Sequence, residues 1–297
     1  MNPATPEQSS EASSLVEKLR GVGVSRPTVD PELAGGLRDW LEDSLADPAS
    51  RLREAGPPIR VGKRALREWA NGEVTDRSLR NPDDVLERAS AHLVGRLFRQ
   101  WVSVGCFENP MSDAMAALAT GGDQAGILET IKRMEAPVRA ELEERVSRHA
   151  SCIAASWPPL NPSWLPRTRE RLTVPLCGGR IVLAGVVDLA IGPQASRNAT
   201  VCLVDIDSSD GPTSIGPHLD FYALLETLRS GAAPSRVATF STRTGELSVR
   251  TVDEHLLVSS LLLTIRIVSR ICEERVRRNR ETGIDETGRI TEETGRK

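Results

Sequence analysis

The sequence predicts an α/β protein with a mixed central sheet, an N-terminal helical region and a long C-terminal helix. Residues 31–157 carry apolar positions at helical spacing, and residues 253–280 form one long pattern of the same kind. Between them, short runs rich in Val, Leu and Ile alternate with Gly- and Pro-containing turns. Strands interrupted by one helix and followed by another are typical of a sheet covered by helices.

The composition limits the kinds of function that the chain can have. Among its 297 residues, 39% are hydrophobic and 27% are charged, as in soluble globular proteins. The formal net charge of -3 gives no global attraction to nucleic acid, so such binding needs a local basic patch. The five cysteines form no CxxC pair, which disfavours a structural zinc or iron–sulfur site. No signal peptide or membrane span is recognisable, so we expect a cytoplasmic protein.

The N-terminal half is expected to be helical. Residues 1–30 are rich in Ser, Pro and Glu and are expected to be poorly ordered. Residues 31–157 form the helical region, with helices predicted at 31–47, 81–105 and 122–157 and a kink or break at Pro137. Residues 57–73 are predicted to be an extended entry into a further helix.

The C-terminal half, residues 158–280, is predicted to be the α/β core. Residues 170–176 and 180–192 read as a hairpin joined by Cys177-Gly178-Gly179. The stretch TVCLVDIDSSDG, residues 200–211, contains the third strand, and residues 215–231 form an amphipathic helix. Residues 235–252 form a second hairpin, a helix covers 253–280, and residues 281–297 are a polar tail.

Acidic side chains cluster where the third strand ends. Asp205 and Asp207 are two residues apart, so they face the same side of a strand, and Asp210 follows in the turn. Asp188 lies in the otherwise apolar preceding strand. If these strands are neighbours, Asp188 and the Asp205/Asp207 pair can converge on one point, where the carboxylates repel each other unless a cation neutralises them. Clustered carboxylates of this kind suit Mg²⁺ or Mn²⁺.

Three short motifs follow one another in the core: Gly185-Val-Val-Asp188, Asp205-Ile-Asp207 at the end of a strand, and His218 with Tyr222 on a helix. In this order they resemble the PD-(D/E)XK nuclease superfamily, RecB-type branch, over about residues 165–250. That branch shows G-x-x-D, then (D/E)-x-K, then Q-x-x-x-Y. The resemblance implies a central sheet of the restriction-endonuclease-like type and Mg- or Mn-dependent hydrolysis of DNA.

Carried over by position, the resemblance makes Asp188 and Asp205 the metal-binding carboxylates. His92, on an N-terminal helix, stands for the upstream metal ligand of the branch, with His149 as the other candidate. Tyr222 and His218 occupy the motif helix, with His218 at the position where Gln is usual. The resemblance places Asp207 in the catalytic group, at the position of the family's lysine.

The replacement of that lysine by Asp207 decides the functional prediction. Lysine occurs only at positions 18, 63, 132 and 297, so no lysine lies on the neighbouring strand or helix. Lys63 or Lys132 can reach the site only through tertiary packing. Arginine stays protonated and suits water activation poorly. The sequence therefore favours a degenerate nuclease-like protein, weakly active or inactive, that acts on or binds DNA.

Other interpretations of the same residues stay open. One is an active Mg- or Mn-dependent DNA nuclease, exo- or endonucleolytic, and another is a non-catalytic subunit whose C-terminal helix docks on a protein partner. Asp188 can cap a turn, Asp205 can pair with an arginine such as Arg180, and Asp207 can be a solvated turn acid. Tyr222 can simply pack on the sheet.

Overall fold

The computed structural model describes residues 15, 17–19, 29–52, 57–70, 82–120, 125–193, 201–209 and 215–281. Most of residues 1–30, Asp210 and the tail after residue 281 lie outside this part. The helices described in full are α2 (Pro31–Leu52), α3 (Lys63–Ala70), α4 (Pro82–Val104), α5 (Pro110–Ala119), α6 (Ala125–Lys132), α7 (Ala136–Ser156), α8 (Pro217–Ser230) and α9 (Glu254–Glu281). The strands are β1 (Ile59–Val61), β2 (Arg167–Leu176), β3 (Ile181–Ile191), β4 (Cys202–Asp207), β5 (Arg236–Ser241) and β6 (Leu247–Thr251).

These six strands form one mixed sheet. Antiparallel pairing joins β2, β3 and β4 in succession, and after the helix α8 the strand β5 returns parallel to β4. Strand β6 lies at one edge of the sheet and pairs antiparallel with β5. The predicted order of three strands, a helix, two strands and a long helix is therefore confirmed, as is the mixed α/β class.

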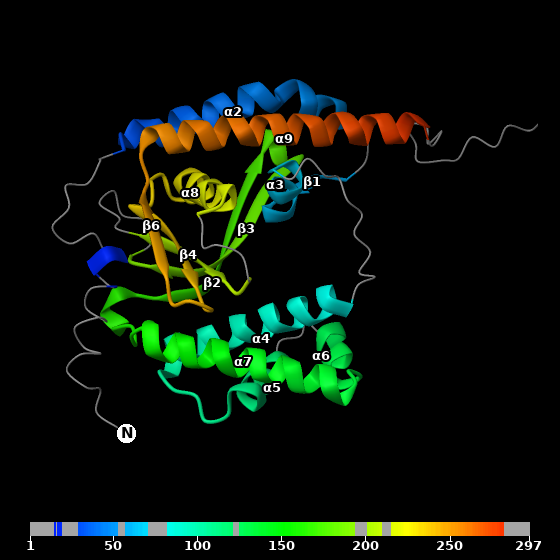
Figure 1. The fold of residues 1–297 in the computed structure, drawn as a ribbon. Helices are drawn as coiled ribbons and strands as arrows, with labels where there is room; N and C mark the ends of the chain where they lie inside the picture. The colour runs from blue at the N-terminus through cyan, green and yellow to red at the C-terminus, as the bar shows by residue number, and fades with distance from the viewer. Residues whose placement is uncertain are drawn as a thin grey trace, which may run out of the picture.

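Helices cover both faces of the sheet (Figure 1). On one side, α2, α8 and α9 bury an aliphatic core with one face of β2, β3 and β4. On the other side, Phe98 of α4 and Trp157, directly after α7, pack against Phe240 of β5. Helices α5 and α6 pack on the outer side of α4 and α7 in a cluster of their own.

The segment around β1 and α3 has the predicted order, an extended stretch followed by a helix, but its extended part also joins the sheet. Strand β1 pairs in parallel with the start of β3, with Ile59 opposite Ile181. Helix α2 packs against α9, on the opposite side of the sheet from α4 and α7. The first part of the predicted helical region therefore belongs to the sheet, through β1, and to the layer formed by α2 and α9. A helical pattern of apolar residues does not reveal the pairing of β1 with β3.

Helix α9 is long and apolar enough, by length and composition, to meet the criterion for a membrane span. Its apolar side chains Leu257, Leu261 and Val268 are fully or almost fully buried in the core shared with α2 and α8. This is the arrangement of a core helix in a soluble protein.

Gly185 of β3 lies directly beneath the ring of Tyr222 from α8. A Cβ atom at position 185 would lie 2.8 Å from Tyr222 Cδ1 and closer still to Cε1. Tyr222 is only 2% exposed, so its ring has little room to move. The glycine and the tyrosine of the two motifs therefore form one packing unit between helix and sheet.

We expect Gly185→Ala to lower the free energy of unfolding by about 1–3 kcal/mol, because the added methyl overpacks this contact. Urea denaturation measures the loss. The matched control is Gly126→Ala on α6, where an added Cβ meets no atom within 4 Å and no loss is expected. Adding Tyr222→Leu to Gly185→Ala should recover part of the stability; a double variant as unstable as the sum of both single changes contradicts the packing explanation.

Candidate active site

The pairing of β3 with β4 brings Asp188 and Asp205 together. The register places Leu189 opposite Val204, so Asp188 is the next residue on β3 and Asp205 the next on β4. The amide of Ile206 donates a hydrogen bond of 3.0 Å to Asp188 Oδ2, and the charge of Asp205 acts on Asp188. The predicted convergence of these two acids is confirmed.

A lysine lies beside this pair. Lys63 Nζ is 2.8 Å from Asp205 Oδ1 and 2.9 Å from Oδ2. The Asp205 side chain is 6% exposed and that of Lys63 is 28% exposed, so the ion pair sits at the edge of the interior. Of the two lysines that only tertiary packing could bring to the site, Lys63 is the one that reaches it.

The route of the chain through β1 explains how Lys63 arrives there. Strand β1 runs along the start of β3, and Gly62 then crosses so close that an added Cβ would lie 2.6 Å from the carbonyl oxygen of Ala184. Only glycine allows this approach, and Lys63 follows as the first residue of α3. The sheet pairing thus delivers the ammonium group to the acids of β3 and β4.

His218 completes the contacts of Asp205. Its Nε2 lies 2.8 Å from Asp205 Oδ2, from the first turn of α8. The imidazole ring packs edge-on against Tyr222, with 5.9 Å between ring centroids. Both predicted residues of the motif helix therefore lie at the site: His218 contacts Asp205, and Tyr222 packs against His218.

The two carboxyl groups respond differently to these surroundings. Burial by itself raises the pKa of Asp205, but the hydrogen bond from His218 and the charge of Lys63 outweigh it and hold that pKa well below its usual range. Burial, followed by the negative charge of Asp205, raises the pKa of Asp188 to about 6. Two adjacent carboxylates with separated pKa values are a frequent feature of functional sites.

Asp207 was predicted to converge with Asp188 and Asp205, but among the described residues it shares none of their contacts. Its Oδ1 accepts a hydrogen bond of 2.9 Å from the Ser209 amide, and its carbonyl oxygen accepts from the amide and the hydroxyl of Thr242. These are the interactions of a turn acid, as the alternative interpretation expected. The catalytic assignment of Asp207 therefore stays a prediction without a supporting contact in the described part of the chain.

His92 lies on α4 in positively charged surroundings. Burial lowers its pKa, and so do the charges of Arg88, Arg96, Arg99 and Arg169. Its predicted role as a metal ligand gains no support from such neighbours, since they repel a further cation. The other candidate, His149, is buried, and its Nδ1 lies 2.9 Å from the hydroxyl of Thr242.

The fit of a divalent cation depends on the Asp188–Asp205 pair. Within the described ranges, no group of three or more His, Cys, Asp or Glu side chains is placed to hold a metal. A zinc cage is therefore not formed by these residues. Mg²⁺, however, keeps several waters and is usually held by one or two carboxylates together with substrate phosphates. Asp188 and Asp205 fit that mode of binding.

Sequence reasoning did not assign Lys63 to the site. The signal that could have found it is the short run Ile59-Arg60-Val61 before Gly62, which is a strand paired with β3 and leads directly into α3. With regard to known proteins, neither a scan of protein-family models nor a search of curated proteins gives a match to this chain.

Proposed function

We propose that this chain is a Mg²⁺- or Mn²⁺-dependent nuclease of the PD-(D/E)XK type, in which Lys63 takes the place of the motif lysine. The observation that carries the proposal is the contact of Lys63 Nζ with both oxygens of Asp205, beside Asp188. Two carboxylates and one lysine are the groups that the resemblance requires, and here they meet from three separate elements.

The topology of the core supports the same proposal. Three antiparallel strands, β2 to β4, are followed by α8 and by β5 parallel to β4. A restriction-endonuclease-like core would place its two acids on the second and third of these strands and its motif helix directly after them. Asp188, Asp205 and His218 occupy those positions.

Each residue has a role that follows from its contacts. Asp188 and Asp205 would hold the divalent cation, which when bound supplies Lewis-acid stabilisation and an activated water. The Ile206 amide and His218 fix the orientation of Asp188 and Asp205 respectively. Lys63 has three donors, so it can keep one bond to Asp205 and orient the attacking water or a phosphate oxygen with another.

The proposal favours the active alternative over a degenerate scaffold. The expectation of inactivity rested on the missing lysine, and Lys63 removes that objection. The free thiols of all five cysteines agree with the proposed cytoplasmic location. DNA is the proposed substrate because the resemblance implies it.

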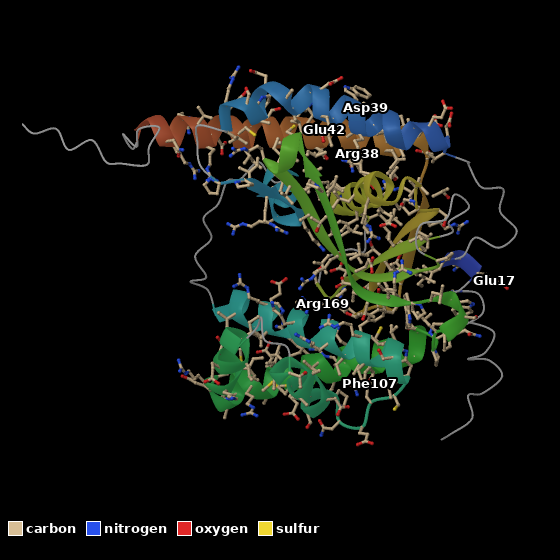
Figure 2. The ribbon with its side chains drawn as sticks, turned by 180° about the vertical axis from the view of Figure 1, so that it is seen from behind. Glu17, Arg38, Asp39, Glu42, Phe107 and Arg169 are labelled. Atoms are coloured by element: carbon tan, nitrogen blue, oxygen red, sulfur yellow. The ribbon has the colours of Figure 1, made fainter. Side chains whose placement is uncertain are left out.

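The test is cleavage of supercoiled and linear DNA with Mg²⁺ or Mn²⁺. We expect the wild-type chain to cleave, EDTA to stop the reaction, and Asp205→Asn to lower the rate at least about 100-fold. Asp39→Asn, an exposed acid on α2, is the matched control and should leave the rate unchanged (Figure 2). Absence of cleavage with both metals, in a folded wild-type protein, would overturn the proposal.

A further inference from the structure

One face of α4 carries a row of basic side chains. Its members recur every three or four residues, the spacing of one helix face, and are Arg88, His92, Arg96 and Arg99. From the first to the last, the row covers about 16 Å at the rise of an α-helix. That is the length of roughly five nucleotides at ~3.4 Å each.

Arg169 of β2 joins this row from the sheet side. Its backbone has a φ of 54°, which is rare for a residue with a side chain. The β2–β3 ladder pairs the residues on both sides of it but omits Arg169 and Asp188. The kink therefore lies directly opposite Asp188, and Figure 2 shows Arg169 between the sheet and α4.

The charges at this place are not balanced. The positive charges of Arg96 and Arg169 act on Arg99, and the acid that opposes them is Asp188. Burial, followed by these like charges, lowers the pKa of Arg99 to about 10. Within the part of the chain that the structure describes, Arg88, Arg99 and Arg169 have no ion pair and no side-chain hydrogen bond. Arg99 and Arg169 are half-buried, and Arg88 is exposed. Half-buried guanidinium groups that repel each other are unfavourable unless an anion joins them.

We infer that the basic face of α4, together with Arg169, binds the phosphate backbone of a nucleic-acid strand and positions one phosphodiester at Asp188. This inference rests on the proposed nuclease function, which it deepens by naming the substrate-binding surface. The charge of Asp188 acts on Arg99, and Arg169 lies opposite Asp188 at the gap in the β2–β3 ladder. These two arginines therefore hold the phosphates next to the reacting one. Arg88 lies about three helical turns before Arg99 on α4, so it holds the nucleic-acid strand further from Asp188.

Binding is tested without cleavage, by fluorescence anisotropy of a labelled oligo(dT) of about twelve nucleotides in EDTA. We expect Arg99→Gln and Arg169→Gln each to weaken binding at least about five-fold at low salt. Each should also reduce the slope of log Kobs against log salt by about 0.7, the value for one phosphate contact on a single strand. Arg139→Gln, an exposed arginine on α7, is the matched control and should change neither quantity.

Loss of binding is separable from loss of fold and from loss of the proposed chemistry. Arg99→Gln removes a repelled, half-buried charge, so its melting temperature should equal or exceed that of the wild type. Unchanged affinity and salt slope in the Arg99→Gln/Arg169→Gln variant overturn the inference, even if the wild type cleaves DNA. Arginine-dependent binding in a chain that does not cleave supports the inference and contradicts only the nuclease proposal.

Discussion

Replacement of Lys63 by methionine is expected to abolish metal-dependent cleavage, with a loss of at least about 100-fold. The ammonium group of Lys63 lies 2.8 and 2.9 Å from the two carboxylate oxygens of Asp205. Methionine keeps an unbranched side chain of similar length and removes the charge. Rates of plasmid cleavage with Mg²⁺ and Mn²⁺ measure the effect.

Two comparisons make this prediction specific. Lys132→Met removes an exposed lysine that pairs with Glu129 at 3.0 Å, and it should cleave at the wild-type rate. Lys63→Arg keeps the charge but should recover little activity, because the guanidinium is larger and holds its proton. A Lys63→Met protein that is folded and as active as the wild type, while Asp205→Asn is inactive, would show that another group performs this role.

Replacement of Asp188 by asparagine is expected to stabilise the protein at neutral pH. Burial and the charge of Asp205 raise the pKa of Asp188 from 3.8 to about 6. The folded state therefore binds this proton more tightly than the unfolded state does, and stability falls as the pH rises from about 4 to about 6. A shift of about two units corresponds to at most about 3 kcal/mol, so we expect a gain of about 1–3 kcal/mol at pH 7 for a side chain that does not ionise.

Urea denaturation between pH 4 and pH 8 tests this expectation. Asparagine keeps an oxygen that can accept the hydrogen bond of the Ile206 amide, so the advantage should come from the charge and should vanish near pH 4. Asp39→Asn should give a difference from the wild type that is small at every pH. A gain at pH 7 that persists unchanged at pH 4, or a loss at pH 7, contradicts the pKa argument.

The Asp188→Asn variant also tests whether the carboxylate pair binds a divalent cation. If the carboxylate pair holds a divalent cation, Mg²⁺ should stabilise the wild type and leave the variant unaffected, because only a ligand that binds the folded state raises its stability. A carboxylate retained at a cost in stability is consistent with the stability–activity trade-off found at many functional sites.

The convergence of Asp188 and Asp205 could be predicted because it depends on local rules. Alternation along a strand and antiparallel pairing of consecutive strands place residues at fixed positions, and both held for β3 and β4. The positions of His218 and Tyr222 near the acids were expected from the family resemblance, which places its helix motif directly after the third strand.

Lys63 and the arginines could not be predicted in the same way. Lys63 and Asp205 are 142 residues apart, and their contact depends on parallel pairing of a three-residue strand with β3. Arg99 and Arg169 come from a helix and a strand with α5 to α7 between them, and the unusual backbone of Arg169 has no signature in its sequence. The polarity pattern of each segment predicts a helix or a strand, but it does not predict that α4 and β2 pack next to each other.

The distance along the chain between Lys63 and Asp205 has a consequence for folding. Closing a loop of 142 residues costs chain entropy that local contacts do not offset, so such a contact forms late. A ribosome must also have released β4 before the lysine can find its partner. The proposed active site therefore forms only when most of the polypeptide has been synthesised, and unfinished chains should lack it.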